Sequence, residues 1–482
     1  MTAELVAGVD SSTQSTKVVV CDAHTGEIVR TGRAPHPDGT EVDPAAWWEA
    51  FGEATGEVLE GVSAIGIGGQ QHGMVTVDEA GEVVRPALLW NDTRSAQAAN
   101  DLTDELGGPG VWAKSVGSVP VASFTVTKLR WLAEHEPENA DRVARVLLPH
   151  DWLTWRLLGR PATAVTDRGD ASGTGYFSPV EGTYRRDVLA HAFGGRTPEL
   201  PTVLGPADVA GHTSAGLLVS AGTGDNMAAA LALELEPGDA VISIGTSGTV
   251  FGVTEHGSAD ASGLVAGFAD ATGHFLPLTA ALNAARVLTA GAAMLGVGLP
   301  EFDRLALAAE PGAAGLTLLP YLDGERTPNL PGAAGSLHGL TRSNMTPENV
   351  ARAAVEGMVC GLAAGLDAVR AQGMDVRRVQ LIGGGAQSAA VRAVAPIVLG
   401  LPVVIPEAGE YVALGAARQA AWALAGSAEP PAWLGSAVTG SGNRLVLDEP
   451  TEALRAAGKE IQRRHLETRE FAHGVPAKFG ED

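Results

Sequence analysis

Residues 5–20 read LVAGVDSSTQSTKVVV, and residues 240–253 read AVISIGTSGTVFGV. Each stretch predicts a β-strand, a tight turn of Gly, Ser and Thr, and a second strand that completes a hairpin. A turn of small residues leaves backbone N–H groups able to face a phosphate, and its hydroxyls add further donors. Because one hairpin opens each half of the chain, we interpret the pair as a duplicated fold that grips a polyphosphate from both sides.

The two hairpins differ in one respect, because only the first carries an acid, Asp10. Asp10 ends an apolar strand at the mouth of the turn, where its carboxylate can hold Mg²⁺ directly or through water. The alternative is a turn-forming Asp that accepts hydrogen bonds from backbone N–H groups. The difference predicts a metal on the side of the first hairpin and phosphate donors on the side of the second.

Length and composition predict a globular protein of two domains. The chain has 482 residues, of which 45% are hydrophobic and 18% are charged. This length exceeds the usual size of a single core, and the composition is that of a chain with ample core. We expect an N-terminal domain over 1–237, a C-terminal domain over 238–430, and an extension over 431–482 that is partly helical with a flexible tail.

Charge and cysteine content exclude several classes of function. The formal net charge is −23, which argues against nucleic-acid or anionic-membrane binding, because phosphate groups are held by clustered Lys and Arg. The two cysteines, Cys21 and Cys360, lie far apart in the sequence, so we expect buried free thiols. The chain shows no basic and apolar leader and no uninterrupted apolar span, which predicts a cytoplasmic protein.

The hydrophobic pattern predicts alternating strands and helices. Asp43 with Pro44, and Thr346 with Pro347, have the residue types of helix starts. A buried strand at 64–68 is expected to pair with a strand near 74–78. The other expected elements are helices at 126–136, 142–148, 152–158, 227–235, 414–424 and 449–469, strands at 379–382 and 403–405, and a helix kinked at Pro396.

Phosphoryl transfer to an alcohol needs a phosphate site, a divalent metal and a base near the hydroxyl. The sequence contains no P-loop and no protein-kinase catalytic loop. The two hairpins must therefore supply the phosphate site of any phosphotransferase built on this chain. The glycines of 383–385 lack a Cβ and would let the backbone approach an adenine and ribose closely, although a flexible turn between strand and helix is the plainer interpretation.

Candidate groups for an alcohol substrate lie in the first half of the chain. Asp225 follows a glycine-rich turn at an expected helix start, where it can act as a base or as an ordinary N-cap. Gln71 and His72 follow a buried strand, where α/β proteins place ligand contacts, but His72 can equally be a core histidine. Trp90 can stack on a sugar or be a buried residue at a strand end.

The pieces, in order, resemble the FGGY family of carbohydrate kinases, which belongs to the superfamily of actin, Hsp70 and hexokinase. Residues 123–135, SFTVTKLRWLAEH, resemble the first signature of the family, and residues 335–340, GSLHGL, resemble its second region. The likeness extends over about residues 5–425. The stretches GQQHG at 69–73, LWND at 89–92, PHDWL at 149–153 and GDN at 224–226 resemble the xylulokinase branch of the family.

The resemblance implies an α/β fold of two actin-like, ribonuclease H-like domains that flank a cleft for nucleotide and sugar. It implies ATP and Mg²⁺ as cofactors, D-xylulose as the sugar that is phosphorylated to its 5-phosphate, and a homodimer as a common state. Asp225 would accept the proton of the sugar hydroxyl, and Asp10 would lie near Mg²⁺ and phosphate. The remaining contacts implied by the resemblance are Gln71, His72 and Asn226 for the sugar, and Gly245, Thr246, Ser247, Gly384, Gly385 and Gln387 for the nucleotide. The residues themselves add Trp90 as a candidate sugar contact, and Ser12, Thr13 and Lys17 of the first hairpin as candidate nucleotide contacts.

Two rival functions remain open at the level of sequence. The chain has Gln71 where many xylulokinases have Met, so another pentulose, a hexulose or a sugar acid is an alternative substrate. Glycerol kinases carry an Arg-Glu pair near the position of His72, and its absence here weighs against glycerol. The rival from another class is a non-catalytic ATP-binding sugar sensor, which would have no need of a base such as Asp225.

Overall fold

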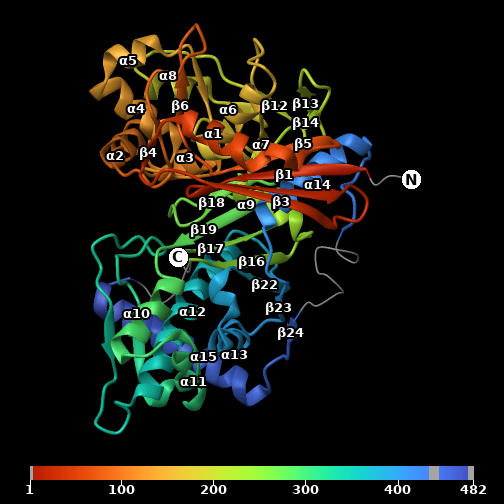
Figure 1. Cartoon of the computed structure of the whole chain (residues 1–482). Coiled ribbons are helices and arrows are strands. Elements are labelled where there is room, and N and C mark those ends of the chain that lie inside the picture. The colour runs from red at the N-terminus through yellow and green to blue at the C-terminus, as the bar shows by residue number, and fades with distance from the viewer. Residues whose placement is uncertain (1–3, 434–444, 476–482) are drawn as a thin grey trace. The chain divides into compact units, whose positions relative to one another are not determined.

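The computed structural model describes residues 4–433 and 445–475 (Figure 1). These residues divide into two compact units, each assembled from three segments of the chain. Unit 1 comprises 4–235, 253–277 and 409–433, and unit 2 comprises 236–252, 278–408 and 445–475. Two segments that the sequence assigned to the C-terminal domain, 253–277 and 409–430, therefore lie in unit 1, together with 431–433 of the predicted extension. Residues 434–444 and 476–482 of that extension lie outside the described residues.

A twisted mixed sheet forms the centre of unit 1. The first hairpin joins β1 and β2 antiparallel, with Asp10 opposite Lys17, and β1 also pairs in parallel with β5. The runs of Val, Ala and Ile in these strands are buried on both faces, as in other parallel sheets covered by helices. The strand order is β13-β14-β5-β1-β2-β3, with β15 also paired to β5. The bounds are β1 Leu5–Ser11, β2 Ser15–Asp22, β3 Ile28–Pro35, β5 Val62–Gly69, β13 Val209–His212, β14 Leu218–Ser220 and β15 Thr223–Gly224.

Helices α9 (Asp225–Ala232) and α14 (Tyr411–Ala425) cover this sheet, although α14 comes from the far end of the chain. Figure 1 shows blue α14 beside the red strands of unit 1. The approach is close enough to require glycine, because a Cβ at Gly8 would lie 1.8 Å from the carbonyl oxygen of Ala413. A Cβ at Gly415 would lie equally close, 1.8 Å, to the carbonyl oxygen of Ala228. The glycines of β1 and α14 thus set the depth at which the two helices pack.

The rest of unit 1 consists of short helices and two-stranded ladders around this sheet. The helix predicted at 142–148 is wrong, because α5 ends at Arg142 and residues Arg145–Leu147 form β8. The strand predicted near 74–78 exists as β6, but it pairs with β8 rather than with β5. The elements are β4 Glu41–Val42, α1 Pro44–Thr55, η1 Gly56–Leu59, β6 Val75–Val77, β7 Ala87–Leu88, α2 Ala96–Glu105, α3 Pro109–Val116, α4 Thr125–His135, α5 Pro137–Arg142, β8 Arg145–Leu147, α6 Pro149–Leu157, β9 Val165–Asp167, α7 Arg168–Ala171, η2 Ser172–Thr174, β10 Phe177–Ser178, β11 Thr183–Tyr184, α8 Arg186–Ala192, β12 Thr202–Leu204 and β18 Ala266–Ala269.

Unit 2 repeats the α/β plan around the second hairpin, β16 and β17. The strands run in the order β19-β17-β16-β22-β23-β24, with β16, β22 and β23 parallel. The long helix α12 packs against this unit's β17 and begins as predicted, with the Thr346 hydroxyl accepting a hydrogen bond from the Asn349 amide. The elements are β16 Asp239–Ile244, β17 Gly248–Gly252, β19 Phe275–Ala281, α10 Ala285–Leu295, α11 Leu299–Ala308, η3 Ala313–Gly315, β20 Thr317–Leu319, β21 Ser336–His338, α12 Pro347–Ala371, β22 Arg378–Ile382, η4 Gly384–Gln387, α13 Ala389–Leu399, β23 Val403–Ile405, β24 Leu445–Leu447 and α15 Glu452–His473.

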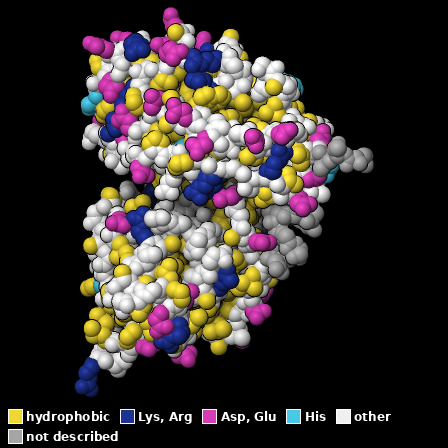
Figure 2. Space-filling view, in the orientation of Figure 1, with side chains coloured by type: hydrophobic (Ala, Val, Ile, Leu, Met, Phe, Trp, Pro, Cys, Tyr) yellow, Lys and Arg dark blue, Asp and Glu magenta, His cyan; other side chains and the backbone are white. Residues whose placement is uncertain are grey.

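Other predictions of local structure are confirmed. Cys21 and Cys360 are buried free thiols, and the Asp43 carboxylate caps α1. No helix within residues 4–433 and 445–475 is long and apolar enough to cross a bilayer. In Figure 2, acidic and basic side chains are interspersed on the visible face of each unit.

Candidate active site

Asp10 lies at the end of β1 in a small cluster of charged groups. The residue is 2% exposed, and its carboxylate accepts a hydrogen bond from the Ser12 hydroxyl. The Lys17 ammonium lies 3.5 Å from Asp10 and 2.7 Å from Glu410 at the start of α14. Burial raises the pKa of the Asp10 carboxyl, while Ser12 and Lys17 oppose that rise. The contacts of the carboxylate with side chains differ from those of an Asp that caps a backbone turn, and they leave Asp10 suited to a cation.

The turn of the first hairpin is held by two aromatic side chains from outside it. His36, just after β3, contacts the Ser12 carbonyl through Nδ1 at 2.9 Å and the Thr16 hydroxyl through Nε2 at 2.8 Å. The indole Nε1 of Trp90 donates to the Thr13 hydroxyl at 2.8 Å. Trp90 is 38% exposed, so the interpretation of a buried strand-end Trp is wrong.

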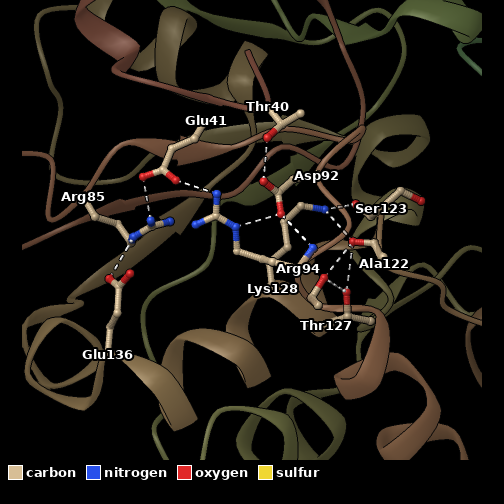
Figure 3. A network of polar contacts seen from close by, with 11 residues as sticks. Thr40, Glu41, Arg85, Asp92, Arg94, Ala122, Ser123, Thr127, Lys128 and Glu136 are labelled. Carbon is tan, nitrogen blue, oxygen red and sulfur yellow. Dashed lines mark hydrogen bonds and ion pairs between the residues drawn. The ribbon is translucent and has the colours of Figure 1, made fainter.

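A polar network fixes the loop that follows Trp90 (Figure 3). The Asp92 carboxylate accepts hydrogen bonds from the Thr40 hydroxyl at 2.8 Å and from Nε of Arg94 at 2.9 Å. Arg94 also pairs with Glu41 at 2.6 Å, and Glu41 pairs with the buried Arg85 at 2.8 Å. Each of these charged groups has a partner, and together the contacts tie the loop after Trp90 to Thr40, Glu41 and Arg85.

Asp225 is the first residue of α9. It directly follows the short strand β15, which pairs in parallel with the last residues of β5. The N-cap of the helix is Gly224, so the interpretation of Asp225 as the N-cap is wrong. One carboxylate oxygen accepts hydrogen bonds of 2.8 Å from the backbone N–H and the side-chain amide of Asn226. Burial raises the pKa of Asp225 to about 7, and the negative charge of Asp10 adds to the rise. A carboxylate with a pKa near neutrality is suited to general base catalysis.

The other predicted sugar contacts lie beside Asp225. The Asn226 amide that binds Asp225 also donates to Oε1 of Gln71 at 3.2 Å. His72 has a positive φ of 69°, which is uncommon outside glycine. Nδ1 of His72 lies 2.6 Å from the Gly173 carbonyl oxygen, and the ring packs against Phe124 with centroids 4.6 Å apart. Gln71, Asn226 and Asp225 therefore form one hydrogen-bonded row.

Several buried polar atoms in the stretches 5–20, 69–73, 89–92 and 123–135 have no hydrogen-bond partner among the described residues. They are Oγ of Ser11, both amide atoms of Gln70, Nε2 of Gln71, Oδ1 of Asn91 and Oγ of Ser123. Ser11 and Gln70 are themselves adjacent, because the Gln70 N–H donates to the Ser11 carbonyl at 3.1 Å. Buried polar groups usually have partners, so such a set fits a ligand rich in hydroxyl groups.

In unit 2 the turn between β16 and β17 carries Gly245, Thr246 and Ser247. The Gly245 carbonyl accepts a hydrogen bond from the Ala285 N–H at 2.9 Å. Arg286 donates to the Thr246 carbonyl at 3.3 Å and pairs with Asp323 at 2.5 Å. These contacts fix the backbone of the turn and leave its hydroxyls on the surface of the unit.

The glycine triplet lies beside this second hairpin. A Cβ at Gly385 would lie 2.3 Å from Cγ2 of Ile244, and Gly383 has a φ of 86°. A Cβ at Gly384 would meet no atom within 4 Å. The predicted contact Gln387 is exposed, and Arg392 donates to its side-chain oxygen at 2.6 Å. Gly383 and Gly385 are thus required by packing, whereas nothing in the fold requires glycine at 384.

Most predicted site residues gather at strand ends, in one group in each unit. Unit 1 holds Asp10, Ser12, Thr13, Lys17, Gln71, His72, Trp90, Asp225 and Asn226, and unit 2 holds Gly245, Thr246, Ser247, Gly384, Gly385 and Gln387. Sequence analysis missed His36, Glu410 and Arg286, which contact the predicted residues from elements distant in the chain. Their partners are set by the tertiary fold, and no local motif marks them.

Comparison with known proteins assigns the chain to a protein family. The model of the N-terminal domain of the FGGY family of carbohydrate kinases matches residues 5–232, and the model of its C-terminal domain matches residues 240–424. The chain belongs to the FGGY family of carbohydrate kinases. The predicted fold of two α/β domains is that of this family and is confirmed, and the chain is an ATP-dependent carbohydrate kinase.

Curated relatives of this FGGY kinase cover most of its length. The xylulose kinase of Streptomyces coelicolor is 51% identical over 439 residues, which are 88% of each chain. The xylulose kinase of Streptomyces rubiginosus is 50% identical and covers 89% of each. The crystal structure of xylulose kinase from Bifidobacterium adolescentis is 46% identical, with a TM-score of 0.87 and coverage of 95% of this chain and 99% of that one.

Proposed function

We propose that this FGGY kinase transfers the γ-phosphoryl group of ATP to the C5 hydroxyl of D-xylulose, giving D-xylulose 5-phosphate and ADP. Similarity over nearly the whole length to curated xylulose kinases supports the choice of sugar. The observation that carries the proposal is Asp225, a carboxylate whose pKa is raised to about 7 beside a row of amide groups.

In the proposed reaction the sugar hydroxyl gives its proton to Asp225 as the hydroxyl oxygen attacks the γ-phosphorus. A new O–P bond forms, the bond from phosphorus to the β–γ bridging oxygen breaks, and ADP leaves with the electron pair of that bond. The Asn226 amide holds one oxygen of Asp225 at 2.8 Å, so the other oxygen is left to accept the proton. Gln71 and His72 orient the sugar, and Trp90 offers it an aromatic face.

The hydroxyls and backbone of the two hairpin turns suit the phosphates of ATP. Asp10 is the residue that would hold Mg²⁺, which when bound offsets phosphate charge. No group of three or more His, Cys, Asp or Glu within the described residues forms a metal cage. Mg²⁺ in kinases is commonly held by one or two carboxylates together with phosphates and water, and a single buried Asp10 fits that pattern.

Two alternative functions are tested alongside the phosphorylation of D-xylulose. Another pentulose, a hexulose or a sugar acid would use the same base, and Gln71 lies where it would contact such a sugar. A non-catalytic sugar sensor would need no base, and the raised pKa of Asp225 weighs against it. The proposal also includes action in the cytoplasm and a homodimeric state, which cell fractionation and sedimentation measure.

The deciding experiment is a panel of sugars with coupled detection of ADP, run on the parent chain and on Asp225→Asn. We expect the highest kcat/KM for D-xylulose and a loss of about 10²–10⁴ in kcat for the variant, with ATP binding retained. Higher kcat/KM for another sugar would replace D-xylulose. ATP binding without sugar-dependent ADP release would favour the sensor, and parental kcat in Asp225→Asn would remove Asp225 as the base.

A further inference from the structure

Unit 1 contains a second buried cluster of charged residues, close to the strand that leads to Asp225. The reaction described above makes no use of this cluster. Its members are His150 and Asp151 on α6, Asp167 at the end of β9, and Asp170 on α7. All four are buried, with exposures of 0%, 1%, 3% and 0%. Isolated buried charges are costly, so a cluster of one imidazole and three carboxylates requires a reason.

The imidazole lies between the carboxylates. Nδ1 of His150 lies 2.7 Å from Asp170, while Nε2 lies 3.4 Å from Asp151 and 3.8 Å from Asp167. Although burial lowers the pKa of His150, the three carboxylates raise it to about 9. The raised pKa favours the charged form of the imidazole, in which Nδ1 donates to Asp170. Nε2 has no hydrogen-bond partner among the described residues.

This cluster is joined to the strand that ends at Asp225. The Thr223 hydroxyl donates to Oδ2 of Asp167 at 2.8 Å, and Thr223 lies two residues before Asp225. The His150 ring packs against Gly222, where a Cβ would lie 2.6 Å from the ring atom Cδ2. The segment 222–224 is thus held by one hydrogen bond and one close contact to the cluster.

The same cluster reaches His72 through the segment that follows Asp167. Asp167 caps α7 by accepting hydrogen bonds from the Gly169 and Asp170 N–H groups at 2.7 and 3.0 Å. Two residues after α7, the Gly173 carbonyl lies 2.6 Å from Nδ1 of His72. The same cluster therefore contacts the segment that carries Asp225, the proposed base, and the segment that contacts His72, the proposed sugar contact.

We infer that Asp167, Asp170 and His150 are positioning residues of the kinase, which fix Asp225 through Thr223 and His72 through Gly173 and set the charge behind the base. The inference rests on the proposed function of Asp225. None of the three contacts the sugar in this assignment, because all are enclosed beneath the strand ends.

The negative charge of Asp170 in this cluster opposes the ionisation of Asp225, the proposed base. The groups facing the imidazolium are Asp151 from α6, Asp167 from β9 and Asp170 from α7, and the hydroxyls of Tyr176 and Tyr184 lie within the field of Asp151. Asp170 and Asp225 each disfavour ionisation of the other. Removal of the negative charge of Asp170 should therefore make Asp225 easier to deprotonate.

The first variant is Asp170→Asn, whose amide oxygen can still accept the hydrogen bond from Nδ1 of His150. We expect the acid limb of kcat/KM for the parent's best sugar to move to lower pH by about half a unit or more, with the fold retained by circular dichroism. Asp260→Asn is the control, since Asp260 is a buried carboxylate of the same unit that accepts hydrogen bonds from Ser262 and the Val265 N–H. An acid limb that stays in place, or one that moves to higher pH, would overturn the electrostatic role.

The second variant, Thr223→Val, removes only the hydroxyl that binds Asp167, and Thr223→Ser restores it. We expect Thr223→Val to lower kcat at least tenfold, as misplacement of a catalytic group does, with KM for ATP unchanged and kcat recovered in Thr223→Ser. Equal kcat for Val and Ser would overturn the positioning role. Failure of the parent to phosphorylate D-xylulose would instead count against the proposed function, since these comparisons use whichever sugar the parent prefers.

Discussion

The indole N–H of Trp90 donates a 2.8 Å hydrogen bond to the hydroxyl of Thr13. One partner is a proposed sugar contact and the other a proposed phosphate contact, so a single bond links the two functions within unit 1. Asp92 and Arg94, in the loop that follows Trp90, bond to each other and to Thr40 and Glu41 (Figure 3). A change at Trp90 or at Thr13 should therefore alter the binding of both the sugar and ATP.

Trp90→Phe tests this link. The variant keeps an aromatic ring and loses the N–H donor, and a lost hydrogen bond of this kind costs about 0.5–1.5 kcal/mol. We expect KM for ATP and KM for the sugar to rise together by about 2–10-fold, the range that this energy gives. Trp48→Phe on α1, where the ring stacks on Phe51, is the control. A rise in KM for one substrate alone would contradict the link.

The raised pKa of Asp225 predicts the pH dependence of the kinase. Since a base must be deprotonated to act, activity should be lost as pH falls through the pKa of about 7. Below that pH, kcat/KM should decrease about tenfold per unit. The measurement is a pH–rate profile with saturating Mg-ATP. The residual activity of Asp225→Asn should show no such limb, and a limb that persists in the variant would belong to another group.

Asp10→Asn predicts an altered requirement for metal. The amide keeps the size of the side chain but loses the charge that we propose for Mg²⁺, so half-maximal activity should need at least about tenfold more Mg²⁺. Asp22→Asn is the matched control, since Asp22 ends β2 of the same hairpin and binds the backbone of His24 and Thr25. A Mg²⁺ titration that coincides with that of the parent would remove Asp10 from the metal site.

Gly384→Ala and Gly385→Ala separate ligand contact from packing. A Cβ added at Gly384 would meet no protein atom within 4 Å, whereas a Cβ added at Gly385 would lie 2.3 Å from Cγ2 of Ile244. We therefore expect Gly384→Ala to keep the parental Tm and to weaken ATP binding measured by calorimetry. Gly385→Ala should lose about 1–3 kcal/mol of stability, as overpacked sites do. Unchanged ATP affinity in Gly384→Ala would place the nucleotide elsewhere.

The cluster around His150 predicts that stability declines in mildly alkaline solution. The pKa of His150 is raised from 6.5 to about 9 in the folded chain. The folded state thus binds more protons than the unfolded state, and the stability gained is present below pH 6.5 and lost as pH rises through about 9. Tm should fall between these limits, and the fall should be smaller in His150→Gln. A parental Tm that is constant over this range would contradict the ionisation of His150.

Sequence periodicity located the elements whose pattern is local. Both hairpins, the start of α12 at Thr346 and the cap of α1 at Asp43 follow from turn and capping preferences that act over a few residues. The region after Arg142 was predicted wrongly because a three-residue strand, β8, offers too short a pattern and is stabilised by its pairing with β6.

The candidate site was predictable to the extent that it lies at strand ends. Asp10 lies near the end of the apolar strand β1, and Gln71 follows the apolar strand β5, which are local signals. Asp225 is marked instead by the glycine-rich turn before α9. Glu410 and His36 carry no such signal, because their roles depend on the closeness of α14 and β3 to the first hairpin. Of the His150 cluster, only His150 and Asp151 lie in a quoted motif, PHDWL at 149–153, because the four members come from three elements that meet in space.

Helix α14 gives unit 1 a late completion during synthesis. Strand β1 is the first element to leave the ribosome, yet Ala413, against which Gly8 packs, follows about 400 residues later. Most of unit 2, the segments 236–252 and 278–408, is made in between. A nascent chain that stops before residue 411 would therefore expose the glycine-lined face of β1 and β5. Such a chain would be prone to aggregate until α14 has been synthesised and covers that face.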